Sequence, residues 1–372
     1  MKVIIAAAGT GGHVNPGIAI ANKIKKEQPD SEIIFIGTTR GLENDLVPRA
    51  GYELKTIEAY GLSKTLSIQN IKRTIKTIKG IGQAKKIVKD FEPDIVIGTG
   101  GYICGAVILA AKKYGIPTIL HESNAFPGKA VKMLASKVDT ILVAFDDAKN
   151  RISKAKNVVL TGTPTKIGRL QLTQKERETK LIKLGFNPEE TIVLIFGGSQ
   201  GAKAINDSIL DIIINNRNQN YQIMWASGPL QYDVIKERLH DNGKNINAIK
   251  KVKIVPYIYD MEETMNLADL VVARSGAITI TEISNIGKPA IFVPLPNVSQ
   301  NHQEYNAKVL ADIGAANIIH NDELTGEKLN MTIQALIKDK EKLVQMGKIA
   351  QSISCENVEE KIYQEIIKLI RK

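Results

Sequence analysis

The sequence predicts an α/β fold made of two Rossmann-like domains, each with a doubly wound parallel sheet. Short apolar runs rich in β-branched residues alternate with segments long enough for crossover helices along the whole chain. Continuous runs of this kind are typical of parallel strands that are covered on both faces. A strand, glycine turn and helix pattern begins twice, at "IIAAAGTGGH" and at "VLIFGGSQGA". The length of 372 residues also suits two domains of roughly 150 to 200 residues each.

The apolar runs define the expected order of the elements. The expected strands are residues 2–8, 31–37, 94–100, 118–122, 140–145, 191–198, 221–228, 269–276 and 289–296. A polar stretch near Gly162 to Arg169 is expected to link the domains, which would span residues 1–164 and 165–355. The last helix, about residues 356–372, has apolar residues at helical spacing and is expected to pack back onto the first domain.

The composition is typical of a soluble globular protein with anionic partners. Against 39 Asp and Glu, the 50 Lys and Arg give a net charge of +11, which favours nucleic acid, anionic lipid or phosphorylated substrates. The two cysteines, Cys104 and Cys355, indicate neither a disulfide framework nor a metal cluster, and they favour a reducing compartment. The apolar run at residues 3–8 is too short for a secretory signal, and residues 95–111 are too short for a membrane span.

Three glycine turns, at residues 9–12, 98–101 and 197–201, follow predicted strands and precede predicted helices. Exposed N–H groups and the positive end of a helix dipole suit a phosphate, although such glycines also permit close packing of strand on helix. The turns do not fit the dinucleotide fingerprint, because Val14 stands where the third glycine would be. The sequence also contains neither a P-loop motif nor a D-x-D pair, so no metal site is expected.

Four polar residues that follow or end predicted strands could take part in catalysis or in ligand binding. His13 follows the first turn at the start of a helix, where the dipole favours a neutral imidazole that could act as a general base. The alternative is a histidine that only bonds to nearby backbone. Glu122 ends a predicted strand, and Asn124 could offer an amide to a sugar. Glu282 either complements a helix dipole or accepts ribose hydroxyls.

Residues 60–89 contain eight Lys or Arg and no acidic residue before Lys89, with Ile68, Ile71, Ile75 and Ile78 on one helical face. One interpretation is a surface helix whose isoleucines pack on the sheet. The other is a membrane-contact segment, residues 64–89, that binds anionic headgroups at about 1 kcal/mol per basic residue. Nucleic acid is not expected as a partner, because Tyr60 is the only aromatic residue here that could stack on bases.

Six motifs in order carry a resemblance to a known family: "GTGGHVNPGIAIA", "GTGGYICGA", "HESNAFPGKA", "GGSQGAKAIN", "RSGAITITEI" and "FVPLPNVSQNHQEYNA". The chain resembles the MurG family, the UDP-N-acetylglucosamine transferases of peptidoglycan synthesis, over nearly its whole length. The resemblance implies a GT-B fold with two domains facing across a cleft. It also implies an inverting transfer of N-acetylglucosamine from UDP to the 4-hydroxyl of the N-acetylmuramoyl unit of lipid I, which makes lipid II.

The resemblance assigns roles to residues that match the family motifs. Glu282 would accept the ribose hydroxyls, the backbone of Ile258 would hold the uracil, and Gln303 would contact the transferred sugar. His13 is the first candidate for the catalytic base and Glu122 the second. The other implied substrate-binding residues are Thr10, Gly11, Gly12, Asn124, Ser199, Ala277, Ile278, Thr279, Ile280 and Thr281. No cofactor is expected, and the protein is expected at the cytoplasmic face of the cell membrane as a peripheral protein.

Two other functions are alternatives to this interpretation. A related GT-B enzyme, such as a glycolipid glycosyltransferase or a nucleotide-sugar 2-epimerase, would share the motifs, and a nucleotide-sugar binding protein would bind the donor without turnover.

One residue departs from the family pattern: Lys166 stands in "GTPTK" where the family often has an arginine. A lysine offers a point charge to a phosphate but not the bidentate fork of an arginine.

Overall fold

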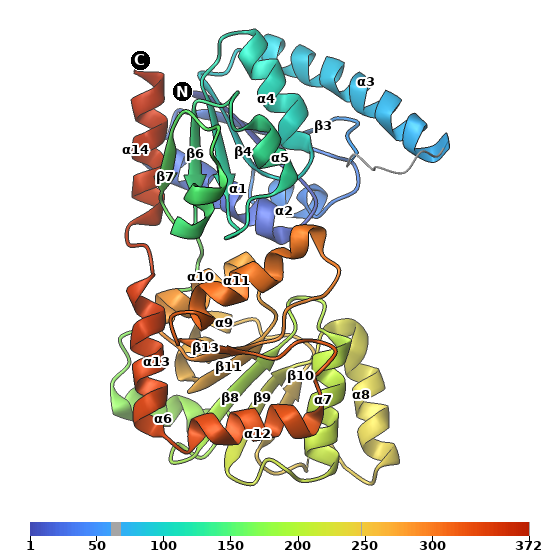
Figure 1. The fold of residues 1–372 in the computed structure, drawn as a ribbon, viewed down its shortest axis with the longest axis vertical. Coiled ribbons are helices and arrows are strands. Elements are labelled where there is room, and N and C mark those ends of the chain that lie inside the picture. The colour runs from blue at the N-terminus through green and yellow to red at the C-terminus, as the bar shows by residue number, and fades with distance from the viewer. Residues whose placement is uncertain (61–67, 247, 372) are drawn as a thin grey trace. The chain divides into compact units, whose positions relative to one another are not determined.

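A computed structural model describes residues 1–60, 68–246 and 248–371, without the side chains of residues 68–72, 74 and 75 (Figure 1). The chain divides into two compact units. Unit 1 consists of Met1–Thr165 together with Cys355–Lys372, and unit 2 consists of Lys166–Ser354. The chain therefore leaves unit 1 once and returns to it at its C-terminal end.

The described part of unit 1 contains a seven-stranded parallel sheet in the order β3-β2-β1-β4-β5-β6-β7. Its strands are β1 (Lys2–Ala7), β2 (Glu32–Gly37), β3 (Glu53–Thr56), β4 (Ile95–Gly100), β5 (Thr118–Glu122), β6 (Thr140–Val143) and β7 (Val158–Leu160). The strand order reverses between β1 and β4, which makes this pair the topological switch point of the sheet.

Helices cover both faces of the unit 1 sheet. They are α1 (Gly11–Glu27), α2 (Glu43–Arg49), α3 (Ile68–Phe91), α4 (Ile103–Lys113), α5 (Lys129–Leu134), the 3₁₀ helix η1 (Asp146–Arg151) and α14 (Val358–Ile370). Val3 and Ile5 of β1 are buried with residues of α1 and α14, and Ile4 and Ala6 are buried on the other face with residues of α3 and α4. Successive side chains of a strand point to opposite faces, so a strand buried on both faces is apolar throughout.

The described part of unit 2 contains a six-stranded parallel sheet in the order β10-β9-β8-β11-β12-β13. Its strands are β8 (Thr191–Phe196), β9 (Tyr221–Ala226), β10 (Val252–Val255), β11 (Leu270–Ala273), β12 (Ala290–Phe292) and β13 (Ala316–Ile318). The switch point lies between β8 and β11. The predicted fold class of two Rossmann-like, doubly wound parallel sheets is confirmed.

The helices of unit 2 are α6 (Gln174–Lys183), α7 (Lys203–Ile214), α8 (Pro229–Asp241), α9 (Met261–Leu267), α10 (Ala277–Ile286), the 3₁₀ helix η2 (Ser299–Asn301), α11 (His302–Ala311), α12 (Gly326–Ile337) and α13 (Lys340–Ser352). Residues of α7, α8 and α12 are buried together with one face of the sheet. Trp225 of β9, the single tryptophan of the chain, is fully buried in this core. None of the helices described in either unit is both long and apolar enough to cross a bilayer.

Candidate functional site

The predicted residues of unit 1 lie at the carboxyl ends of three neighbouring strands. Thr10, Gly11, Gly12 and His13 follow β1, and the second glycine turn ends β4, so both turns flank the switch point. Glu122 ends β5, the next strand along, and Asn124 follows it. Ligands of open parallel sheets bind at this edge, beside the switch point.

His13 lies in the first turn of α1 and is half-buried. Its Nδ1 lies 3.0 Å from the backbone oxygen of Ala8. A carbonyl oxygen can only accept, so Nδ1 carries the proton and the neutral ring keeps its lone pair on Nε2. Among the described residues Nε2 has no hydrogen-bond partner. The imidazole is therefore oriented to accept a proton at Nε2 while Nδ1 stays bonded to the backbone.

Gly100 lets His13 take this position. A side chain at Gly100 would overlap the imidazole ring, and the φ of Gly100 is +135°, a conformation that L side chains rarely adopt. Thr99 also donates to the backbone oxygen of His13 over 2.8 Å. The end of β4 therefore holds the first turn of α1, which links the first two glycine turns of the sequence in space.

Glu122 is a buried carboxylate, 5% exposed, whose oxygens accept hydrogen bonds from the loop that follows it. One oxygen accepts from the backbone and side-chain nitrogens of Asn124, each at 2.9 Å. The other accepts from the backbone nitrogen of Gly128 at 2.7 Å. These three bonds order residues 122–128 and set the position of the Asn124 amide. They favour a structural role for Glu122 over the role of a base.

Glu43 was missed by the sequence analysis and is tied to the first glycine turn. Its side chain is fully buried, and Oε2 accepts from the backbone nitrogen of Gly9 at 2.8 Å. Oε1 accepts from the backbone nitrogen of Thr38 at 2.9 Å and from its hydroxyl at 2.8 Å. No local pattern in "RGLENDLVP" marks this contact, because 34 residues separate Gly9 from Glu43.

In unit 2 the predicted residues also follow neighbouring strands. Ser199 lies in the turn after β8 and is exposed, and Ala277 to Glu282 form the first part of α10 after β11. Ile258 follows β10 and is 6% exposed, and Gln303 lies in the first turn of α11. All four segments therefore belong to the carboxyl edge of the sheet, two of them at its switch point.

The helices that follow β8 and β11 begin without side-chain caps. Within the described residues, Ala202 and Gly276 precede α7 and α10 and make no capping hydrogen bond, and neither first turn holds an acidic residue. The backbone N–H groups at these two helix starts are therefore open to an anion, and both helix dipoles favour one.

Arg274 adds a cation beside these helix starts, and it too was missed by the sequence analysis. It stands directly after β11 and is only 9% exposed. Nη1 donates to the backbone oxygens of Val293 at 2.9 Å and Pro294 at 3.1 Å, while Nε has no partner in the described part of the chain. The available signal was a charged residue directly after an apolar run in "DLVVARSG".

Gln303 joins this edge to α11. Its side-chain oxygen accepts from the backbone nitrogen of Leu295 at 2.9 Å, and its backbone oxygen accepts from the hydroxyl of Ser275 at 2.8 Å. Asn306 donates to the backbone oxygen of Ser275 over 3.2 Å. These bonds hold the start of α11 against Ser275, two residues before the first residue of α10.

A cavity of about 380 Å³ in unit 2 lies elsewhere. Thr191, Asp269 and Pro289 line it, and they mark the amino ends of β8, β11 and β12. It therefore lies at the sheet edge opposite the candidate residues. No group of three His, Cys, Asp or Glu side chains that could hold a metal ion occurs within residues 1–60, 68–246 and 248–371.

Models of known protein families match both units. Residues 3–143 match the glycosyltransferase family 28 N-terminal domain, and residues 192–364 match the glycosyltransferase family 28 C-terminal domain. The matches begin in β1 and in β8, the strands that open the two sheets.

Curated relatives match the chain from end to end. A protein of Acetivibrio thermocellus is 44% identical over 374 residues, which cover 100% of this chain and 99% of the relative. A protein of Caldanaerobacter subterraneus is 41% identical over 364 residues, which cover 98% of each. Both are named UDP-N-acetylglucosamine--N-acetylmuramyl-(pentapeptide) pyrophosphoryl-undecaprenol N-acetylglucosamine transferase.

Solved structures share the fold. MurG of Acinetobacter baumannii superposes with a TM-score of 0.78 at 28% identity, covering 99% of both chains. A UDP-GlcNAc 2-epimerase of Neisseria meningitidis superposes with a TM-score of 0.65 at 15% identity, covering 99% of this chain and 100% of that one. The second likeness is one of fold alone.

Proposed function

Because the chain belongs to glycosyltransferase family 28, together with the MurG enzymes, we propose that it transfers N-acetylglucosamine from UDP-N-acetylglucosamine to lipid I. The acceptor is the 4-hydroxyl of the N-acetylmuramoyl unit, and the product is lipid II. Its two Rossmann-like units are of the GT-B type. The observation that carries the proposal is the end-to-end identity of 44% with the Acetivibrio thermocellus protein, which is named as an N-acetylglucosamine transferase acting on N-acetylmuramyl-(pentapeptide) pyrophosphoryl-undecaprenol.

We assign the UDP-sugar to the carboxyl edge of the unit 2 sheet. The uncapped starts of α7 and α10, with Ser199 and Ala277 to Thr281, would hold the diphosphate. The buried guanidinium of Arg274 adds positive charge at the same edge. Glu282 would accept the ribose hydroxyls, the backbone of Ile258 would hold the uracil, and Gln303 would contact the sugar. Donors fixed in this way stabilise the charge that develops on the leaving UDP.

We assign the proton acceptor to His13 of unit 1, with Thr10, Gly11, Gly12 and Asn124 near the transferred sugar. The acceptor hydroxyl oxygen attacks the anomeric carbon, and the bond from that carbon to the diphosphate oxygen breaks. The hydroxyl proton goes to Nε2 of His13, and UDP leaves with the bonding electron pair, so the anomeric configuration inverts. The tautomer of His13 supports this assignment. The three hydrogen bonds of Glu122 make it the weaker candidate.

We place the protein at the cytoplasmic face of the cell membrane, with α3 as the contact. Ile78 of α3 is 63% exposed, so this isoleucine does not pack on the sheet. Arg73, Lys76 and Lys79 near it are exposed as well. An exposed isoleucine among basic residues suits an anionic bilayer surface. Residues 64–67 and the side chains of Ile68, Ile71, Lys72 and Ile75, which belong to the same expected segment, lie outside the described residues.

The proposal is tested by the acceptor dependence of UDP release. Purified protein with UDP-N-acetylglucosamine and a lipid I analogue should release UDP, and release should stop when the analogue is omitted. A 2-epimerase would consume the donor without an acceptor, and a binding protein would bind it without turnover. Either of these results would contradict the transferase function.

A further inference from the structure

Glu43, the first residue of α2 after β2, holds the first glycine turn, which follows the neighbouring strand β1. Its carboxylate is fully buried and receives three hydrogen bonds, from the backbone of Gly9 and from the backbone and hydroxyl of Thr38. Gly9 is held on its other side too, because its carbonyl oxygen accepts from the backbone nitrogen of Leu42 over 3.1 Å. A side chain at Gly41 would overlap the Glu43 carboxylate, so the segment is shaped around this contact.

The carboxylate is charged despite its burial. Burial by itself raises the pKa of Glu43, but the hydrogen bonds from the backbone of Gly9 and from Thr38 more than offset this and hold the pKa below its usual range. Within the described residues no Lys or Arg forms an ion pair with it. The negative charge is therefore stabilised by one N–H of the glycine turn, that of Gly9, and by the N–H and hydroxyl of Thr38.

A carboxylate in this place changes what the turn can bind. In a phosphate loop the backbone N–H groups point at the phosphate. Here the N–H of Gly9 is already bonded to a buried anion, which would repel a second one. The N–H of Gly9 is therefore not available to a ligand, and the N–H groups at the uncapped start of α1 are the ones that the described turn can offer.

We propose that Glu43 is a positioning residue that acts on the reaction through Gly9, and this rests on the proposed function. Gly9 lies between Ala8, whose oxygen accepts from His13, and Thr10, Gly11 and Gly12. By holding Gly9 at both of its backbone groups, Glu43 and Leu42 set the position from which His13 and the turn meet the acceptor and the sugar. The carboxylate does not itself touch a reacting atom.

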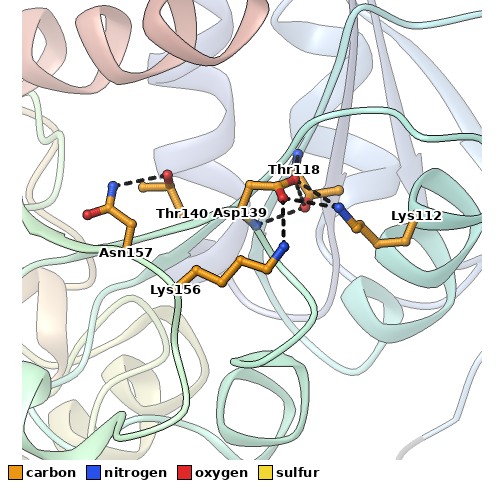
Figure 2. A network of polar contacts seen from close by, with 6 residues as sticks. All are labelled: Lys112, Thr118, Asp139, Thr140, Lys156 and Asn157. Atoms are coloured by element: carbon orange, nitrogen blue, oxygen red, sulfur yellow. Dashed lines mark hydrogen bonds and ion pairs between the residues drawn. The ribbon is translucent and has the colours of Figure 1, made fainter. Parts of the chain in front are cut away.

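The test compares Glu43→Gln with Asp139→Asn. Asp139 is a matched carboxylate, because its Oδ2 also accepts from the backbone nitrogen and hydroxyl of a threonine, Thr118, at 3.0 Å and 2.9 Å (Figure 2). It also pairs with Lys112 and Lys156. Thr118 and Thr140 begin β5 and β6, so Asp139 lies at the amino edge of the same sheet.

A glutamine keeps the shape of Glu43 but must present its amide nitrogen to one of two N–H donors. We expect kcat to fall roughly 10- to 100-fold, because small displacements of catalytic groups cost about this much. The Kd for UDP should stay within about twofold of the wild-type value, since the donor residues belong to unit 2. Asp139→Asn should lower the melting temperature and leave kcat of the folded protein within about twofold of wild type.

Three results would overturn the inference: wild-type kcat in Glu43→Gln, a kcat loss that only follows its folded fraction, or an equal kcat loss in Asp139→Asn. If Glu43→Gln does not fold, Thr38→Val removes one hydroxyl donor and keeps the charge. It should lower kcat about three- to tenfold, and unchanged kcat would contradict the inference. Measuring wild-type protein in the same assay separates the proposed function from the inference about Glu43. If the wild-type protein shows no turnover, the proposed function is contradicted, whereas the role of Glu43 is contradicted only by the variant results above.

Discussion

The two histidines of unit 1, His13 in α1 and His121 in β5, differ in what their environments allow. His13 is half-buried, with Nδ1 bonded to the backbone and Nε2 without a described partner. His121 is 1% exposed, its Nε2 lies 3.0 Å from the backbone oxygen of Gly162, and its Nδ1 lies 3.4 Å from the hydroxyl of Ser123. Only His13 is therefore placed to exchange a proton with a ligand.

Replacement of His13 and of Glu282 should separate turnover from donor binding. We expect His13→Ala to lower kcat by 100-fold or more, because a positioned general base contributes roughly 10²- to 10⁴-fold, and to leave the Kd for UDP unchanged. Glu282→Ala should weaken UDP binding about tenfold or more through the lost hydrogen bonds to the ribose. Steady-state kinetics and calorimetric titration with UDP measure both. Wild-type kcat in His13→Ala would show that it is not the base and would make Glu122→Gln the next variant to measure.

His121 should make the protein less stable as the pH falls. Burial lowers the pKa of His121 from its usual 6.5 to about 4. Between these values the unfolded chain takes up a proton that the folded protein does not, so the free energy of unfolding decreases by about 3 kcal/mol as the pH falls from 6.5 to 4.

The variant His121→Gln keeps an N–H donor for Gly162 and does not titrate. Urea unfolding at several pH values should therefore show a shallower loss of stability in this variant than in the wild type. Parallel pH dependences in the two proteins would contradict the prediction.

At the scale of elements, the strands that the sequence pattern missed are the four sheet edges. These are β3 and β7 in unit 1 and β10 and β13 in unit 2. They are three or four residues long and contain exposed or half-buried positions. An edge strand has a neighbour on one side only, so its sequence need not be a long apolar run. The central strands are buried on both faces and were predictable for that reason.

Helix α3 offers a test of membrane contact with a matched control. Ile78→Glu should reduce binding to vesicles that contain anionic lipid about tenfold, because it removes an apolar contact and adds a repelled charge. Ile182 of α6 is 64% exposed, almost the same as Ile78 at 63%. Ile182→Glu should therefore leave vesicle binding unchanged, and co-sedimentation measures both. Equal binding of the two variants would exclude Ile78 from the contact.

At the scale of the whole molecule, the chain closes unit 1 with its last helix. Ile362 and Ile366 of α14 are buried in the core beside α1. Tyr363 accepts from Gln28 over 3.0 Å, and Glu360 pairs with Lys23 at 2.6 Å. The core of unit 1 therefore depends on residues from both ends of the chain, whereas unit 2 is continuous in sequence.

Substitutions in α14 should destabilise unit 1 and spare unit 2. Ile362→Ala and Ile366→Ala should each cost about 2–5 kcal/mol, as is typical of buried large-to-small changes. Trp225 lies in the unit 2 core, so its fluorescence follows unit 2, while circular dichroism follows both units. We expect the fluorescence transition in urea to stay in place. Ile333→Ala, in α12 of unit 2, should move it. A fluorescence transition that shifts with the α14 variants would show that the units unfold together.

The sequence by itself determined the two sheets and the segments at their carboxyl edges. Strands buried on both faces must be apolar throughout, and glycine turns at the ends of β1, β4 and β8 leave a local pattern in the sequence. The tertiary structure decided the contacts between segments distant in sequence. Glu43 meets Gly9 across 34 positions, and Gln28 meets Tyr363 across 335. Such pairs produce no periodic pattern in the sequence. Each side chain fits the pattern of its own helix or strand, and the tertiary fold determines which distant residue it contacts.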